Sequence, residues 1–142
     1  MSSKVSFFHY TSISGLEDII SSGNIHESNH ANNHAHFGKG TYGTSMSPSV
    51  GRGKIAKYNW GRHGKYYIRN GKMARAIEVK IPSSKVKRAN HRGRDILVHE
   101  GPVKLSDYPG WVEWTVPATD YSAYFSDSDD DGTDLFDLLG IW

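Results

Sequence analysis

The sequence contains no cysteine among its 142 residues, which excludes disulfide bonds and thiolate-bound metal sites. It has no run of about 18 apolar residues, the length that a membrane-spanning helix needs, and its mean hydropathy is −0.59. The first residues include a single lysine and no apolar segment of the kind found in secretory signals. We therefore expect a monomeric protein that does not bind membranes and resides in the cytoplasm, with delivery into another cell left open.

Acidic residues are nearly absent from the middle of the chain. Between Gly38 and Arg94 there are fifteen Lys and Arg residues and one acid, Glu78. From Asp95 onward the balance reverses, with eleven acids and one lysine, Lys104. A basic middle favours a polyanionic partner, either the pyrophosphate of a dinucleotide or a nucleic acid. Mutual neutralisation of the two regions within the fold is an equal alternative.

The length fits one domain spanning 1–142, with a solvated, poorly ordered acidic segment at 126–134. Alternation and β-propensity predict strands at 5–10, 73–81, 95–99, 111–117 and 121–125. Two short helices are expected, one capped by Ser14 and ended by Gly23, the other over 50–60. Residues 61–72 are predicted as loop, and 83–94 as a basic connection. This order predicts an α+β fold with a mostly antiparallel sheet.

The stretch 36–48 gathers three glycines, Gly38, Gly40 and Gly43, around one aromatic residue, Tyr42. Glycine serves where the backbone bends tightly or approaches a ligand closely. An aromatic ring among glycines offers a flat face on which a planar ligand can stack. A glycine-rich turn with a core tyrosine explains the same residues and, on this stretch alone, is the better interpretation.

Four features occur in a fixed order along the chain. They are Phe8-His9-Tyr10-Thr11-Ser12, an amphipathic segment from Gly15 to Gly23, Phe37-Gly-Lys-Gly-Thr-Tyr42, and Glu113 within a late strand. Together they resemble the catalytic core of the ADP-ribosyltransferase superfamily, in the His-Tyr-Glu/Asp branch that includes poly(ADP-ribose) polymerases and small toxin-type members. The resemblance implies a split antiparallel sheet and NAD+ as substrate.

The resemblance also implies residue roles. His9 would bond a ribose hydroxyl of NAD+, and the backbone of Tyr10, beside Thr11, would hold the nicotinamide amide. Tyr42 would stack on the nicotinamide, and Tyr58 would cover its other face. Gly40 belongs to the same ligand-binding turn, and Ser45 or Ser47 would replace a serine that polymerases carry where this chain has Ile55.

Glu113 would be the catalytic acid. Cleavage of the nicotinamide–ribose bond develops positive charge on the sugar, as in glycoside hydrolysis, and a carboxylate on the ribose 2′-hydroxyl stabilises that charge. No metal is required. Toxin-type members are described by an aspartate at this position, so Glu100 and Asp107 are alternative acids. The short chain favours mono-ADP-ribosylation of a protein or nucleic acid, or NAD+ hydrolysis, over polymer growth.

Three further patterns suggest other functions. His26, His30, His34 and His36 share one Asn-rich loop, which favours a polar loop over a metal site. The run 127–132 begins like a calcium-binding loop, but its twelfth position is Leu138, which supplies no carboxylate. The basic and aromatic region from Lys54 to Arg94 could instead form a non-catalytic nucleic-acid-binding module.

Overall fold

The computed structural model describes residues 3–27, 40–61, 64–91, 94–118 and 121–125. The strands are β1 (Lys4–Thr11), β2 (Asn24–Ile25), β3 (Thr41–Gly43), β4 (Arg75–Pro82), β5 (Val86–His91), β6 (Arg94–His99), β7 (Val103–Lys104) and β8 (Val112–Thr115). The helices are α1 (Ile13–Ser22), α2 (Arg52–Trp60), α3 (Gly64–Arg69) and α4 (Tyr121–Tyr124), with 3-10 turns η1 (Pro48–Val50), η3 (Ser83–Lys85) and η4 (Leu105–Asp107). The fold is mixed α+β, as predicted.

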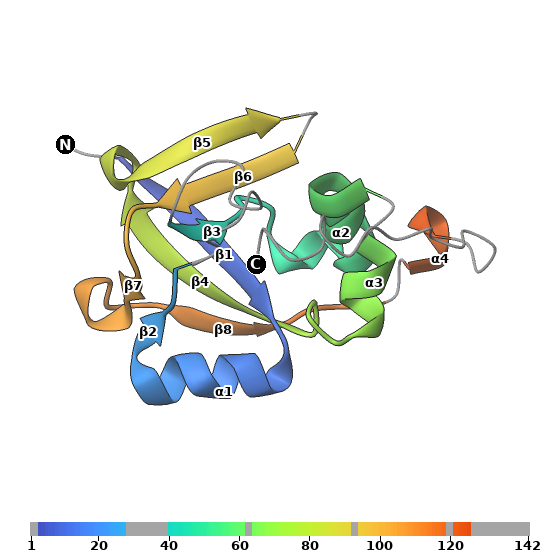
Figure 1. Cartoon of the computed structure of the whole chain (residues 1–142), viewed down its shortest axis with the longest axis horizontal. Helices are drawn as coiled ribbons and strands as arrows, with labels where there is room; N and C mark the ends of the chain where they lie inside the picture. The colour runs from blue at the N-terminus through green and yellow to red at the C-terminus, as the bar shows by residue number, and fades with distance from the viewer. Residues whose placement is uncertain (1–2, 28–39, 62–63, 92–93, 119–120, 126–142) are drawn as a thin grey trace.

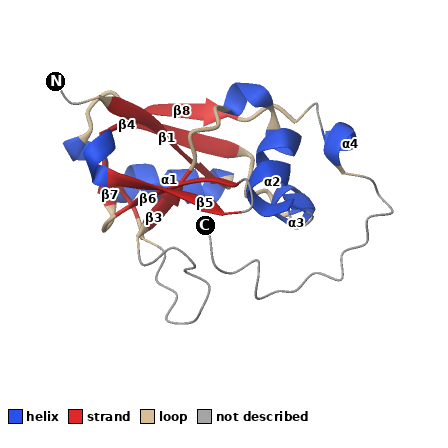
Figure 2. Ribbon diagram, turned by 90° about the horizontal axis from the view of Figure 1, so that it is seen from above, coloured by secondary structure: helices blue, strands red, loops and turns tan. Residues whose placement is uncertain are grey.

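Three antiparallel sheets organise the described part of the chain. Their strand orders are β1-β4-β8, β3-β6-β5 and β2-β7. β1 pairs with β4 along its whole length, from Lys4 opposite Pro82 to Thr11 opposite Arg75. The β5–β6 hairpin lies to one side of β1, and α2 and α3 lie together beyond the end where β1 finishes (Figures 1 and 2).

Buried side chains form two clusters because successive residues of a strand point to opposite faces. The α1 cluster contains Phe7, Leu16, Ile19, Ile25, Ile77, Val79, Ile81, Leu97, Val103 and Leu105. The α2–α3 cluster contains Phe8, Tyr10, Tyr42, Ile55, Ala56, Trp60, Tyr67, Met73, Ala76, Ile96, Val98, Val116 and Phe125. β1, β4 and β6 contribute alternate residues to both clusters, although β4 gives the α2–α3 cluster only Ala76 and carries Glu78 and Lys80 further along that face.

Helix α1 follows β1 after a single residue, Ser12. The Ser12 side chain accepts a hydrogen bond from the backbone N–H of Gly15 at 3.0 Å and caps the helix. The prediction of Ser14 as the cap was therefore wrong by two residues. Gly23 ends the helix, as predicted, in a left-handed conformation with φ of 76°, which glycine adopts without strain.

Three predicted elements differ from the structure. Residues 61–72, predicted as loop, contain α3, whose Gly64 packs against α2 so closely that a Cβ would lie 2.6 Å from the Ala56 carbonyl oxygen. The predicted connection 83–94 contains β5, a strand whose polar sequence lacks an apolar alternation. The predicted strand 121–125 is instead the short helix α4. Packing against neighbouring elements, which local sequence does not encode, decides all three.

Polar side chains connect β1, β4 and β8 on the α2–α3 face. The Lys80 ammonium donates to the Ser6 hydroxyl at 2.5 Å and lies 3.1 Å from a Glu78 carboxylate oxygen. The indole N–H of Trp114 donates to the other Glu78 oxygen at 3.0 Å. Burial acts to raise the pKa of Glu78, but these hydrogen bonds and the Lys80 charge outweigh it, so the pKa lies below its usual value. We call this set of contacts the polar ladder.

Candidate active site

β1 pairs with the residue that follows β3, Thr44, through one isolated bridge. Phe8 and Thr44 exchange two backbone hydrogen bonds of 2.9 Å, and this isolated bridge is the β1–β3 pairing seen in the described residues. Backbone polar groups of a strand alternate between its two sides, so the N–H and C=O of Tyr10 point toward β3 as those of Phe8 do. A gap in the ladder therefore opens beside Tyr10.

The His9 side chain contacts β3 at this gap. Its Nδ1 lies 2.9 Å from the backbone carbonyl oxygen of Tyr42. Because a carbonyl oxygen only accepts, Nδ1 carries the proton, and Nε2 of the neutral ring has acceptor character. Desolvation by burial lowers the pKa of His9 more than the bond to Tyr42 raises it, so the imidazole is neutral at neutral pH.

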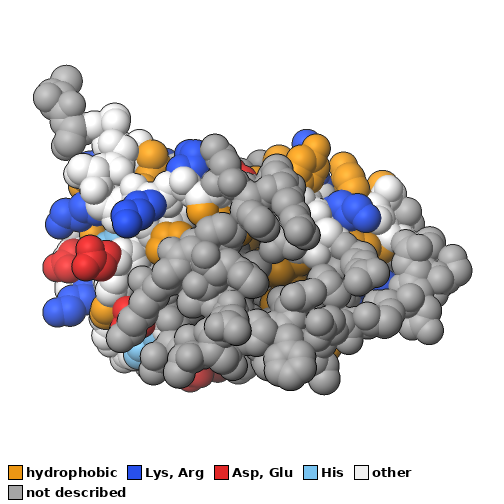
Figure 3. All heavy atoms as spheres, turned by 45° about the horizontal axis from the view of Figure 1, so that its top comes forward, with side chains coloured by type: hydrophobic (Ala, Val, Ile, Leu, Met, Phe, Trp, Pro, Cys, Tyr) orange, Lys and Arg blue, Asp and Glu red, His pale blue; other side chains and the backbone are white. Residues whose placement is uncertain are grey.

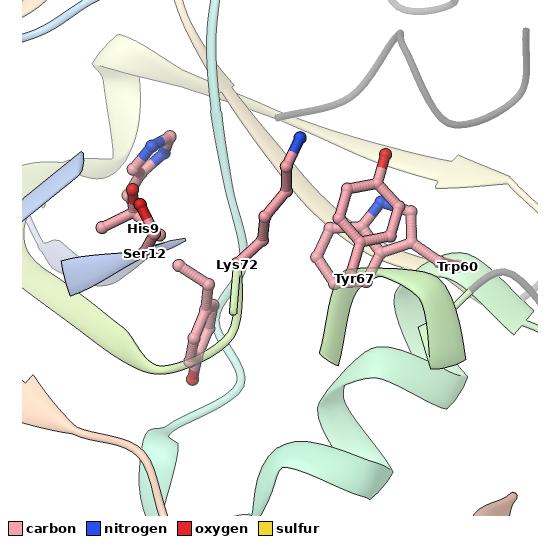
Figure 4. Close-up of a pocket in the computed structure, with 7 residues that line it drawn as sticks. His9, Ser12, Trp60, Tyr67 and Lys72 are labelled. Carbon is pink, nitrogen blue, oxygen red and sulfur yellow. The ribbon is translucent and has the colours of Figure 1, made fainter. Parts of the chain in front are cut away.

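A cavity of about 210 Å³ lies at this end of β1 (Figure 4). Its lining residues are His9, Tyr10, Thr11, Ser12, Trp60, Tyr67 and Lys72. Trp60 at the end of α2 and Tyr67 in α3 stack with ring centroids 4.5 Å apart and planes at 23°. The Lys72 ammonium lies 5.7 Å from the centre of the Tyr67 ring. In Figure 4 the Lys72 side chain lies between His9 and the stacked aromatic pair.

This cavity combines three kinds of recognition. Trp60 and Tyr67 form an aromatic wall, although they stack on each other and are only 2% and 1% exposed. Lys72 offers a positive charge for an anion such as a phosphate. His9 and the Tyr10 backbone offer directional hydrogen bonds to hydroxyl and amide groups. Such a combination suits a ligand that contains a flat heterocycle, a sugar and a phosphate.

Tyr42, the tyrosine of the glycine-rich stretch, is not among the residues that line this cavity. Tyr42 is 1% exposed and its ring packs in the α2–α3 cluster, so its carbonyl rather than its ring reaches His9. Added Cβ atoms would lie 2.7 Å from the His99 carbonyl oxygen at Gly40 and 2.5 Å from the Phe7 ring at Gly43. Packing explains both glycines, whereas Gly38 lies outside the described residues.

Two further predicted ligand contacts, Ser45 and Tyr58, are not among the residues that line the cavity. The Ser45 hydroxyl donates to the Asp95 carboxylate, whose other oxygen pairs with Arg88 at 2.8 Å. Tyr58 is 51% exposed on α2, and the Lys54 ammonium lies 5.9 Å from its ring centre. Trp60, two residues further along α2, is the aromatic residue of that helix that lines the cavity.

Glu113 lies in β8 at the same height along the sheet as His9. Both residues are paired in register with Ile77 of β4, Glu113 from one side and His9 from the other. Directly paired residues share a face, so the two side chains project to the same side, about 10 Å apart across two strand spacings. Glu113 is exposed and is not among the residues that line the cavity. The alternative acids Glu100 and Asp107 are exposed as well.

Four residues that line the cavity were not predicted from the sequence as site residues: Ser12, Trp60, Tyr67 and Lys72. Ser12 closes the motif that begins at Phe8. Trp60, Tyr67 and Lys72 lie in the basic and aromatic region Lys54–Arg94, which by itself suggests a nucleic-acid surface. Among the described residues no group of three or more His, Asp or Glu side chains could hold a metal. His30, His34, His36 and the acidic run lie outside that part of the chain.

No family model matches this chain, and comparison with curated proteins and with solved structures gives no match either. None of the helices in the described ranges is both long and apolar enough to cross a membrane.

Proposed function

We propose that this chain is an NAD+-dependent mono-ADP-ribosyltransferase that also hydrolyses NAD+ when no acceptor is present. The observation that carries the proposal is the separation of β1 from β3 at His9, which opens onto a cavity with a stacked aromatic pair and a lysine. The order of His9, the glycine-rich stretch and Glu113 along the chain supports the same activity.

Each part of NAD+ has a matching group in this proposal. The carboxamide of nicotinamide bonds the backbone of Tyr10, which lines the cavity, and a ribose hydroxyl donates to Nε2 of His9. Trp60 and Tyr67 supply aromatic surface for a base, in place of the stacking face first expected at Tyr42. Lys72 offsets the charge of the diphosphate.

The reaction breaks the bond between C1′ of ribose and N1 of nicotinamide. The electron pair of that bond leaves with the nitrogen, which neutralises the pyridinium and leaves positive charge on the sugar. Glu113 bonds the ribose 2′-hydroxyl and stabilises this charge. The acceptor oxygen or nitrogen then bonds C1′ and releases its proton. Water as acceptor gives ADP-ribose and nicotinamide.

Measurement of nicotinamide released from NAD+ tests the proposal. We expect Glu113→Gln to lower the rate at least about a hundredfold, the loss seen when one electrostatic stabiliser is removed. Trp60→Ala is expected to raise the KM for NAD+ more than it lowers kcat, because its role is binding. Glu100→Gln, which removes another exposed carboxylate, serves as the matched control and should retain activity.

Three outcomes would count against these assignments. If the wild-type protein releases nicotinamide only at the uncatalysed rate, the proposed enzymatic activity is contradicted. That result would leave a non-catalytic nucleic-acid-binding module over Lys54–Arg94 as the alternative. If Glu100→Gln is inactive and Glu113→Gln is active, the catalytic acid is Glu100. If the KM for NAD+ is unchanged in Trp60→Ala, the aromatic pair does not bind NAD+.

A further inference from the structure

A second cavity, of about 230 Å³, lies at the opposite end of β1 from the first. Its lining residues are Lys4, Lys80, Pro82, Lys85, Asp107, Tyr108 and Pro109. Lys4 is the first residue of β1, Lys80 belongs to β4 and Lys85 to η3, so three separate elements direct a lysine to one place. We call this site the lysine cavity.

The charges around the lysine cavity are unbalanced. Lys80 is engaged in the polar ladder, where it contacts Ser6 and Glu78. Asp107 is the single acid in the lining. Among the described residues neither Lys4 nor Lys85 has a salt-bridge partner, and both are exposed. Glu78 offsets the charge of Lys80, so Lys4 and Lys85 leave an excess of positive charge over Asp107. A bound anion would offset this excess.

The surroundings favour an extended polyanion. Lys87 follows on β5 as a further exposed lysine, and Arg88 beside it pairs with Asp95. Figure 3 shows Lys and Arg side chains, with acidic ones among them, gathered at the end of the molecule where β5 begins. The wall also includes Tyr108, whose hydroxyl is 3.0 Å from Nε2 of His99 and is thereby held in place.

A lipid surface fits this site less well. Peripheral membrane sites add exposed apolar side chains to their basic residues. The large apolar side chains exposed in the described residues are Ile13, Ile20, Val50, Tyr58 and Val112, and none of them lines the lysine cavity. The nucleic-acid backbone, with phosphates at regular intervals, matches both the cavity and the basic residues beyond it.

We propose that the lysine cavity binds phosphate groups of a nucleic-acid strand. The site uses none of the residues assigned to NAD+, so it does not depend on the proposed enzymatic activity. If that activity holds, the lysine cavity would make nucleic acid the favoured class of acceptor.

Binding of a fluorescent single-stranded oligonucleotide, measured by anisotropy at several salt concentrations, tests this proposal. The variant with both Lys4→Ala and Lys85→Ala is expected to bind at least tenfold more weakly. The slope of log affinity against log salt concentration should be smaller in magnitude by about 1.4, because two phosphate contacts that contribute about 0.7 each are lost. Lys4→Arg with Lys85→Arg keeps both charges and should bind as the wild type does.

Matched variants and competitors distinguish a specific phosphate site from general attraction, a free anion or a lipid. The double variant Lys54→Ala and Lys57→Ala removes the same charge from α2 and should leave affinity nearly unchanged. Equal losses of affinity in both alanine pairs would mean general electrostatic attraction and would overturn a specific site. Unchanged binding by the variant with Lys4→Ala and Lys85→Ala would overturn it as well.

Competitors test the identity of the anion. Displacement of the oligonucleotide by inorganic phosphate at similar concentration would point to a free anion, and lysine-dependent binding to anionic vesicles alone would point to lipid. Either result overturns the proposal.

Nicotinamide release is measured on the same proteins. The Lys4 and Lys85 variant is expected to release nicotinamide at the wild-type rate. Lys4 lies about 23 Å from Thr11 along β1, and Lys85 follows Pro82, which is paired with Lys4 at the same end of the strand. Loss of oligonucleotide binding with normal nicotinamide release supports phosphate binding at the lysine cavity, whether or not the protein is an enzyme. Failure of the enzymatic proposal would leave the binding result intact.

Discussion

Gly43 shows how one missing side chain shapes the core beside the candidate site. The aromatic ring of Phe7 occupies the space that a Cβ at position 43 would need, at 2.5 Å from the ring. Phe7 itself is fully buried in the α1 cluster. This glycine is therefore required by packing between β1 and β3 rather than by a turn.

Replacement of Gly43 by alanine should destabilise the protein by about 1–3 kcal/mol, because overpacking forces neighbours to shift. Phe7→Leu shortens the side chain that fills this space and costs stability by itself. In the double variant the new methyl group has room, so the combined loss should be smaller than the sum by at least about 0.5 kcal/mol. Urea unfolding of the four proteins measures this coupling, and strictly additive losses would show that the contact is unimportant.

His9 should make stability depend on pH. Its folded pKa lies below the ordinary histidine value of 6.5, so the unfolded chain binds more protons in the interval between the two values. Stability contributed by the neutral ring is complete above pH 6.5 and declines as the pH falls toward the folded pKa. His9→Asn keeps a donor near Nδ1 but does not titrate.

Unfolding free energies measured from about pH 7.5 to about pH 5.5 bracket this interval around the ordinary histidine pKa. We expect a smaller decline in His9→Asn than in the wild type. If the unfolding free energy changes with pH equally in the two proteins, His9 is as easily protonated in the folded protein as in the unfolded one.

At the scale of single residues, the sequence could predict what lies at the end of a recognisable strand. His9, Tyr10 and Thr11 all line the cavity. The family resemblance implied them as site residues, and the polar residues after the apolar segment indicated where β1 ends. Trp60, Tyr67 and Lys72 could not be predicted in the same way. Their meeting depends on how α2 packs on α3, and that contact joins residues with no regular spacing.

At the scale of elements, helix α1 illustrates how local capping chemistry fixes a boundary. Both Ser12 and Ser14 are suitable caps by residue type, and their hydroxyls lie 3.2 Å apart. Only Ser12 has the extended backbone of a cap together with the bond from the Gly15 N–H. The capping pattern in the sequence therefore located the helix but not its first residue.

We expect Ser12→Ala to destabilise the protein by about 1 kcal/mol, the usual cost of losing an N-cap. Ser14→Ala should stay within about 0.5 kcal/mol of the wild type, because the residue is exposed and its backbone position needs no cap. Thermal unfolding compares the two variants directly. A larger loss in Ser14→Ala than in Ser12→Ala would return the cap to position 14.

Elements without an apolar pattern were the ones that sequence could not locate. β5 carries Lys87 and Arg88 and pairs with β6 from Val86 opposite His99 to His91 opposite Arg94. Its backbone completes the ladder while its side chains remain mostly polar, so alternation of hydrophobicity is absent. α3 spans only six residues and gains its stability from contact with α2 rather than from helical propensity.

For the whole molecule, the two faces of β4 determine how this strand aligns with its neighbours. Where one face is buried and the other is polar, a shift by one residue moves apolar side chains out of the core and is strongly disfavoured. In β4, Ile77, Val79 and Ile81 are buried in the α1 cluster, whereas Glu78 and Lys80 occupy the other face. The hydrophobic pattern of β4 therefore already disfavours a shifted pairing.

The polar ladder adds to this selection. A one-residue shift of β1 would move the Ser6 hydroxyl away from Lys80, and a shift of β8 would move the Trp114 indole N–H away from Glu78. Lys80 is exposed and would lose little, but the largely buried Glu78 carboxylate would lose a hydrogen-bond donor, which costs free energy. The four polar residues thus discriminate the native alignment from its neighbours, and this alignment is what sets His9 and Glu113 on either side of Ile77.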